Sequence, residues 1–168
     1  NTWDYYTQSD AFIDWLKHIR DSHIPMFNPA DVVLQNIHKF YLRDFEKNGI
    51  RIIPTIFSDK NQPILLDTLK HKAWERVVIK PAVSAGSYQT KIHTVAELTQ
   101  QTLNELLSDD DRLIQPFLPE IGQGELSMIF FMGKFSHAVV KKPKDGDFRV
   151  QRQYGGKYEL FHPNPALL

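Results

Sequence analysis

The chain of 168 residues contains no cysteine. This absence excludes disulfides, thiolate catalysis and zinc sites built on thiolates, and it agrees with a cytoplasmic protein. The sequence also shows no signal peptide and no apolar run long enough to cross a bilayer, so we expect no membrane partner.

The sequence has no excess charge of either sign, because 20 Lys and Arg residues balance 20 Asp and Glu residues. No global electrostatic field therefore favours nucleic acid or an acidic membrane, and an anionic ligand must be held by a local cluster. Aromatic residues are plentiful but follow no basic stripe, so we expect no single-stranded nucleic-acid partner.

Three familiar motifs are also missing. The sequence has no Walker pattern G-x-x-x-x-G-K-[ST], which excludes a P-loop as the phosphate site. Its seven histidines form no H-x-x-x-H or H-E-x-x-H pair, so we expect no histidine metal site. No G-x-S-x-G elbow surrounds a serine, which argues against a serine nucleophile.

What the sequence does have is a strand that leads into a loop of small side chains at residues 77–91. Val77, Val78 and Ile79 are β-branched and suit a buried strand, which holds Lys80 at a fixed place. Residues 82–87, called the small-residue loop below, carry only one side chain larger than serine, so backbone amides can approach a ligand or the loop can close as a lid. A cation on a rigid strand beside exposed amides suits a polyphosphate. The alternative is an ordinary surface lysine next to a turn.

Helices and strands alternate around this run. Ser9 as a cap predicts the start of a first helix, Pro29 at the first helical position predicts a second, and Gly49 ends a third. Thr94 and Glu97 form a capping box that predicts the start of a later helix. We further expect a strand at residues 50–57, a short helix at 65–74 and a strand at 113–118.

A hairpin is predicted near the end of the sequence, with strands at residues 125–132 and 135–142 and with Gly133 and Lys134 at the centre of the turn. The first of these strands is apolar on both faces, so we expect packing on each side and a carboxylate, Glu125, that enters a covered sheet. Arg149 follows a turn rich in cations, where its guanidinium could clamp a phosphate or a carboxylate. The alternatives are an acid in water and a solvated hairpin tip.

Four motifs in register resemble the ATP-grasp superfamily over nearly the whole chain. They are Asn36-Ile37-His38-Lys39, Val78-Ile79-Lys80-Pro81 with the small-residue loop, Ile114-Gln115-Pro116-Phe117-Leu118 ahead of Glu125, and Gly146-Asp147-Phe148-Arg149 before Gly155-Gly156. The narrower resemblance is to the branch of prokaryotic glutathione synthetase and the ribosomal-protein glutamate ligases, and especially to the group around the D-cycloserine-forming cyclo-ligase.

The resemblance implies an α+β ATP-grasp fold, in which two α+β lobes hold ATP between them, here incomplete at both ends. It places a helical and linker segment at residues 1–75, the N-terminal lobe at 76–118 and the start of the C-terminal lobe at 119–168. Family members hold magnesium with acidic and asparagine residues after the Gly-Gly segment. The sequence shows no such pattern, so we expect no metal ligand within it and both the magnesium ligands and a preceding domain outside it.

The resemblance also implies a role for each matched residue. Lys39 and Lys80 would approach the phosphates of ATP from opposite lobes. The carbonyl of Pro116 would accept a hydrogen bond from the adenine amino group, and a nearby amide such as that of Leu118 would donate to the ring. Arg149 would be catalytic, because it would stabilise the transferring phosphoryl group or the acyl phosphate. The complete set expected to bind the nucleotide is Lys39, Lys80, Ser84, Ala85, Gly86, Ser87, Gln115, Pro116, Phe117, Leu118, Glu125 (at the ribose) and Gln151.

The activity that the resemblance implies is an ATP-dependent carboxylate–amine ligase with an acyl phosphate intermediate. Its substrates would be a small-molecule carboxylate and a small-molecule amine, and relatives of this kind are often homo-oligomers. Two alternatives stay open: an ATP-grasp kinase that transfers phosphate to a hydroxyl, and a non-catalytic nucleotide-binding module.

Overall fold

The computed structural model describes residues 4–60, 62 and 64–167. The chain is mixed α+β with two sheets, as predicted. It divides into two compact units, unit 1 up to Phe117 and unit 2 from Leu118 onward. The lobe boundaries that the resemblance suggests stay a prediction. No helix in the described part of the chain is long and apolar enough to span a membrane.

Unit 1 is built around a four-stranded sheet with the order β1-β4-β2-β3. Its strands are β1 (Ile56–Ser58), β2 (Arg76–Pro81), β3 (Lys91–Thr94) and β4 (Arg112–Pro116), and every neighbouring pair is antiparallel. Ile79 on β2 lies opposite Lys91 on one side and Ile114 on the other. Because side chains alternate along a strand, Ile79 and Lys80 point to opposite faces of the sheet.

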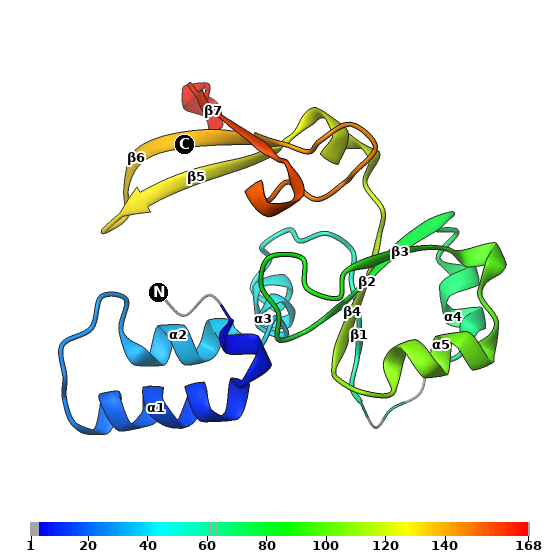
Figure 1. The fold of residues 1–168 in the computed structure, drawn as a ribbon, viewed down its shortest axis with the longest axis horizontal. Coiled ribbons are helices and arrows are strands. Elements are labelled where there is room, and N and C mark those ends of the chain that lie inside the picture. The colour runs from blue at the N-terminus through cyan, green and yellow to red at the C-terminus, as the bar shows by residue number, and fades with distance from the viewer. Residues whose placement is uncertain (1–3, 61, 63, 168) are drawn as a thin grey trace. The chain divides into compact units, whose positions relative to one another are not determined.

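One face of this sheet is covered by α4 (Leu66–His71) and α5 (Gln100–Leu107), as Figure 1 shows. Val77, Ile79 and Ile114 of the sheet form a core cluster with leucines of the two helices, among them the fully buried Leu69 and Leu103. This apolar burial fixes which strand residues face the helices and which face away. We call this side the helix face of the sheet.

The first helices of unit 1 form a separate cluster. They are η1 (Tyr5–Thr7), α1 (Ser9–Asp21), α2 (Ala30–Ile37) and α3 (Tyr41–Lys47). Leu16, Ala30 and Ile37 are buried between α1 and α2, and Val83 of the small-residue loop packs against them. The loop is therefore anchored to the helical segment that precedes the sheet.

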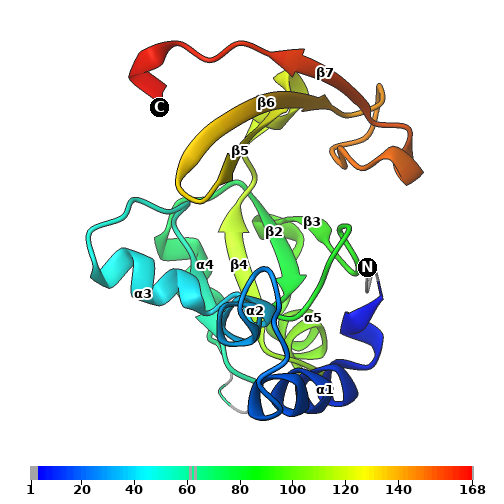
Figure 2. The same cartoon turned by 90° about the vertical axis from the view of Figure 1, so that its left-hand side faces the viewer.

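Unit 2 contains a three-stranded antiparallel sheet with the order β5-β6-β7 (Figure 2). Its strands are β5 (Glu125–Phe131), β6 (Lys134–Lys142) and β7 (Lys157–Phe161). Short 3₁₀ turns accompany them at η3 (Pro119–Gln123), η4 (Arg152–Tyr154) and η5 (Pro165–Leu167).

Two predicted helix starts are wrong in detail. Ser9 is already the first residue of α1, and its predecessor Gln8 makes no side-chain cap bond. Thr94 ends β3 opposite Arg76 and is followed only by a 3₁₀ turn, η2 (Val95–Glu97), in which its side chain makes no cap bond. The cap of α5 is instead Thr99, whose side-chain oxygen accepts from the amide of Thr102 at 3.1 Å. The predicted end of the third helix is confirmed, since Gly49 takes a φ of +78° just after α3.

The other boundaries shift modestly. Pro29 precedes α2 instead of occupying its first position, the expected strand 50–57 is reduced to β1, and the expected helix 65–74 is reduced to α4. The hairpin is confirmed, but Met132 and Gly133 are its central residues, with φ of +50° and +77°. Positive φ at both positions is the geometry that matches the twist of a two-residue hairpin.

The expected packing on both faces of β5 is not found. None of its seven residues is buried, and Leu126, Met128, Phe130 and Phe131 are each at least 38% exposed. The apolar pattern that suggested burial therefore belongs to a strand whose side chains the described chain leaves accessible.

Candidate functional site

Lys39 lies between α2 and α3 and is fastened to the small-residue loop. Its backbone amide donates to the carbonyl of Ala82 at 3.0 Å. Its side-chain Nζ donates to the carbonyl of Ser84 at 2.6 Å, to Ser84 Oγ at 3.0 Å and to the carbonyl of Ala82 at 3.3 Å. The lysine thus directs its donors at the backbone where the loop begins.

Burial, followed by the charge of Lys80, lowers the pKa of Lys39 from 10.5 to about 8. Desolvation disfavours the charged ammonium, and a second cation nearby adds to the effect. The two lysines therefore feel each other within unit 1. The expectation that they come from opposite lobes is wrong, because both belong to the unit that ends at Phe117.

The small-residue loop is held in a compact turn. Tyr88 donates its amide to the carbonyl of Ala85 at 3.0 Å, and Gly86 and Ser87 take φ values of +59° and +61°. Ser84 is 6% exposed, and its hydroxyl donates to the carbonyl of Pro81 at 3.1 Å. Successive small residues with positive φ turn the backbone sharply, as the sequence suggests for a loop that lies close to a ligand.

The predicted adenine segment follows β4 into unit 2. Gln115 lies opposite Val78 on β2, so the two side chains share a face of the sheet. Lys80 is two residues from Val78 on the same strand and therefore projects to that face as well. Its side chain is 6% exposed and donates to Thr55 Oγ1 at 2.8 Å, so its amide group has a structural partner.

Of the residues after Gln115, Phe117 is bonded to Arg76, whereas Leu118 is exposed. Phe117 donates its amide to the carbonyl of Arg76 at 2.9 Å, and its ring lies 4.2 Å from the Arg76 guanidinium carbon. Pro116 ends β4, and Leu118 is 41% exposed at the start of unit 2.

Glu125 lies in unit 2 at the start of β5, directly opposite Lys141 on β6. The Lys141 ammonium lies 3.1 Å from Glu125 Oε1, and the glutamate side chain is 45% exposed. The prediction of a carboxylate inside a covered sheet is therefore wrong, and Glu125 is an accessible acid with one cationic neighbour.

Arg149 is held by Asp147 two residues earlier. Its Nε and Nη2 donate to the two carboxylate oxygens at 3.0 and 2.8 Å, and Asp147 Oδ1 also accepts from the backbone amides of Phe148 and Arg149. The guanidinium carbon lies 3.7 Å from the centre of the Tyr154 ring. These bonds hold the pKa of Asp147 well below its usual range and raise that of Arg149.

The Gly-Gly segment closes the turn that contains Gln151. The carbonyl of Gln151 accepts from the amides of Tyr154 and Gly156, at 2.9 and 3.2 Å. A Cβ at Gly156 would overlap the carbonyl oxygen of Val150, so the chain can approach itself here only without a side chain.

Unit 1 thus brings together Lys39, Lys80 and the small-residue loop, with Gln115 on the same sheet face as Lys80. Glu125, Arg149 and Gln151 lie in unit 2. Within residues 4–60, 62 and 64–167, no group of three His, Asp or Glu side chains is arranged to hold a metal ion.

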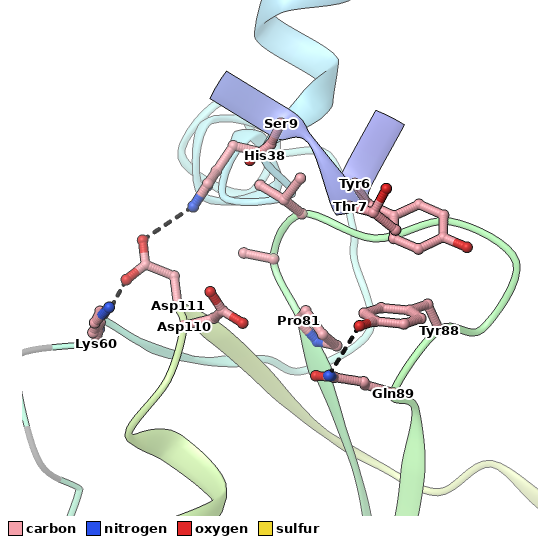
Figure 3. Close-up of a pocket in the computed structure, with 12 residues that line it drawn as sticks. Tyr6, Thr7, Ser9, His38, Lys60, Pro81, Tyr88, Gln89, Asp110 and Asp111 are labelled. Carbon is pink, nitrogen blue, oxygen red and sulfur yellow. Dashed lines mark hydrogen bonds and ion pairs between the residues drawn. The ribbon is translucent and has the colours of Figure 1, made fainter. Parts of the chain in front are cut away.

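Sequence reasoning missed a group of residues beside the loop. Tyr6 of η1 lies with its ring 4.6 Å from that of Tyr88, and both line a pocket of about 450 Å³ (Figure 3). On its other side, Asp111 accepts from the amide of Lys60 at 2.8 Å and lies 3.0 Å from His38 Nε2. These partners lie far apart in the sequence, and only the position of His38 next to Lys39 could have drawn attention to them.

Three comparisons place these features among known proteins. Residues 38–162 match the family described as prokaryotic glutathione synthetase, ATP-grasp domain. The cycloserine biosynthesis protein DcsG of Streptomyces lavendulae is 26% identical over 150 residues, which are 83% of this chain and 49% of that protein. The glutathione synthetase of Prochlorococcus marinus is 34% identical over 89 residues, or 51% of this chain and 29% of that protein.

Solved structures share the fold. The crystal structure of D-cycloserine synthetase DcsG aligns with a TM-score of 0.78 and 21% identity, covering 97% of this chain and 58% of that one. A D-alanine–D-alanine ligase from Bacillus anthracis complexed with ATP aligns with a TM-score of 0.58 and 18% identity, covering 80% and 43%. This chain spans about half the length of the DcsG protein of Streptomyces lavendulae, although the match covers 83% of this chain.

Proposed function

The chain belongs to the ATP-grasp domain family of prokaryotic glutathione synthetases, and from this membership we propose that it is the nucleotide-binding part of an ATP-dependent carboxylate–amine ligase. The observation that carries the proposal is the grouping of Lys39, Lys80 and the small-residue loop in one unit, with no Walker motif in the sequence. Two neighbouring ammonium groups beside a loop of small residues suit a polyphosphate.

The donor set of unit 1 fits ATP. The lowered pKa of Lys39 reflects a cation that is partly buried next to a second cation. The phosphates of a nucleotide would relieve this repulsion and replace lost hydration. We assign Lys39 and Lys80 to the phosphates and residues 84–87 to the backbone that covers them.

The remaining nucleotide contacts are assigned along the chain that leaves β4. The carbonyl of Pro116 accepts from the adenine amino group, and the amide of Leu118 donates to the ring, since the amide of Phe117 is already bonded to Arg76. Gln115 supports this segment through Thr55. Glu125 accepts from the ribose hydroxyls, and Lys141 orients its carboxylate.

Arg149 is the residue to which we assign catalysis, with Gln151 beside it. Asp147 occupies one edge of the guanidinium by accepting from both Nε and Nη2, which fixes the plane of the group. A fixed cation stabilises charge that develops on phosphoryl oxygens without reorganising during the reaction. We assign magnesium no ligand among the described residues, because none of them form a suitable cluster.

The chemistry follows from the poor reactivity of a carboxylate. A carboxylate oxygen attacks the γ-phosphorus of ATP, the bond to ADP breaks, and an acyl phosphate forms. The amine then attacks the acyl carbon, loses a proton and displaces inorganic phosphate, which leaves an amide. Both steps place negative charge on oxygens, where lysine and arginine lower the barrier. Closure of the small-residue loop would keep water from hydrolysing the acyl phosphate.

Incubation of the full-length protein with ATP and panels of small acids and amines tests the proposal. A ligase releases phosphate only when both an acid and an amine are present. A phosphorylated product without amide would identify a kinase instead, and nucleotide binding without turnover would identify a binding module; either outcome overturns the ligase proposal.

A lysine variant tests the site itself. We expect Lys80→Ala to weaken ATP binding by at least about tenfold, because a charge-assisted contact with phosphate is lost. Lys134→Ala, at the exposed start of β6, is the matched control and should bind as the unaltered protein does. Equal ATP affinity in the two variants would contradict the role of Lys80.

A further inference from the structure

A second pocket of unit 1 lies on the helix face of the sheet, away from Lys80. Lys91 lies opposite Ile79, and His93 lies opposite Val77, so both project to the side of the sheet that α5 covers. Arg112 on β4 projects to the same side, because it lies two residues from Ile114. The pocket has a volume of about 230 Å³ and is lined by these three side chains together with Ile79, Gln89, Glu105, Leu106 and Asp109.

Arg112 is a buried lining residue of this pocket, and one of its donors lacks a partner among the described residues. The residue is 7% exposed, and its Nε has no hydrogen-bond partner within residues 4–60, 62 and 64–167. Its nearest ion pair, from Nη2 to Asp110 Oδ2, measures 3.9 Å, which is too long for a hydrogen bond. A buried guanidinium without a full set of acceptors is unfavourable, so a bound oxyanion would stabilise it.

Two further basic side chains converge on the same place. His93 Nε2 is buried and also lacks a partner among the described residues. Lys91 lies two residues earlier on the same strand. Burial is the larger cause of the lowered pKa of His93, and the charge of Lys91 is the smaller one. Only β2 lies between β3 and β4, so the backbones of β3 and β4 are about 10 Å apart. Long side chains from these two strands can therefore reach the same ligand.

The opposite wall of the pocket is acidic. Glu105 and Asp109 come from the end of α5 and the turn that follows it. Glu105 Oε1 accepts from Gln101 at 3.0 Å, and Asp109 Oδ1 accepts from Ser108 at 3.0 Å. No ion pair joins these two carboxylates to the basic wall in the described part of the chain, so the two signs of charge stay apart across the pocket.

We propose that this pocket binds a small α-amino acid as its zwitterion. The carboxylate pairs with the guanidinium of Arg112, with Lys91 and His93 beside it, and the ammonium donates to Glu105 and Asp109. An anion alone would face the two carboxylates, and a cation alone would face the basic wall without an acceptor for Arg112. The volume lies below the roughly 300–1,000 Å³ typical of drug-sized ligands, which favours a compound as small as glycine or alanine.

This site is separate from the proposed nucleotide site, because Lys80 and Gln115 point to the other face of the same sheet. A bound amino acid would therefore contact unit 1 on the helix face of the sheet, at β3, the strand that follows the small-residue loop. The inference does not rest on the proposed ligase activity, since binding is measured without nucleotide.

The test compares four ligands on the full chain without nucleotide: glycine, acetate, methylammonium and inorganic phosphate at equal ionic strength. Nuclear magnetic resonance of the His93 ring reports occupancy. We expect glycine to shift the ring signals and to raise the pKa of His93, because a carboxylate arrives beside it. Acetate and methylammonium each lack one half of the interaction and should bind at least about tenfold more weakly. Phosphate binding without glycine binding, or no response of His93 to glycine, would overturn the proposal.

Substitutions of the accessible residues avoid the risk of unfolding that a change at Arg112 carries. Lys91→Gln and Glu105→Gln should each weaken glycine binding by about tenfold, one at each end of the ligand. Lys72→Gln and Glu97→Gln change the same charges at exposed positions that do not line the pocket, and they should leave binding unaltered. Equal effects of the test pair and the control pair would refute a specific site.

Discussion

Raising the pH should weaken nucleotide binding through a single amine, that of Lys39. Burial and the charge of Lys80 lower its pKa from 10.5 to about 8 in the folded chain. Phosphates favour the ammonium form, so the pKa of Lys39 should be higher with nucleotide bound than without it. Above pH 8 the free protein must therefore take up a proton when it binds, and the affinity falls as the pH rises.

The size of the effect follows from the pKa. The fall from 10.5 to about 8 corresponds to an upper limit on the order of 3 kcal/mol in the free energy of protonation, at about 1.4 kcal/mol per pKa unit. If the amine is protonated in the complex, the fraction of free protein that is ready to bind drops about 25-fold between pH 7.5 and pH 9.5. The affinity for a non-hydrolysable ATP analogue should drop by the same factor.

Isothermal titration calorimetry in two buffers with different ionisation enthalpies measures both the affinity and the proton uptake. Uptake should approach one proton per nucleotide at pH 9.5 and be small at pH 7.5. Lys39→Arg keeps its charge over this range and should show neither proton uptake nor the loss of affinity. An independent check is the titration of the Lys39 ε-methylene group by nuclear magnetic resonance. A midpoint near 10.5, together with equal affinity at both pH values, would refute the reasoning.

Three further changes test other parts of the chain. Leu103→Ala removes a fully buried side chain of the unit 1 core and should lower the free energy of unfolding by about 2–5 kcal/mol in urea denaturation; a loss under about 1 kcal/mol would contradict its place in the core. Asp147→Asn loosens the guanidinium of Arg149 and should lower the kcat of the full-length protein about 10- to 100-fold with little change in the KM for ATP; an unaltered kcat would count against it. Gly156→Ala should speed hydrogen exchange in β7, whereas Gly122→Ala, with open space around it, should not; matching exchange would refute the close approach at residue 156.

The local features of the fold were largely predictable, and the tertiary bonds were not. The β-branched run of β2 and the apolar pattern of β5 and β6 predict strands because side-chain shape acts within a few residues. The hairpin turn is one residue off, since Met132 accepts a positive φ that the sequence rule reserves for glycine. The capping box is followed by the 3₁₀ turn η2 and not by an α-helix, because Thr94 pairs with Arg76 on the neighbouring strand, a tertiary contact that overrides the local signal.

The candidate site divides in the same way. The motifs place Lys39, Lys80 and the small-residue loop in the chain, but no pattern predicts that the Lys39 amine donates to carbonyls 43 and 45 residues away. The link between His38, just after α2, and Asp111, just before β4, spans 73 residues. Such bonds follow from the packing of whole elements, which spacing along the sequence does not encode.

The hydrogen bonds of Lys39 change how ligand entry should be understood. Because its Nζ already donates to the carbonyl and hydroxyl of Ser84 and to the carbonyl of Ala82, a phosphate does not meet a vacant cation. Entry is an exchange of one set of acceptors for another, and the Ser84 carbonyl must be released before the new bond forms. The observed association rate should then level off at high ligand concentration, at the rate of that release.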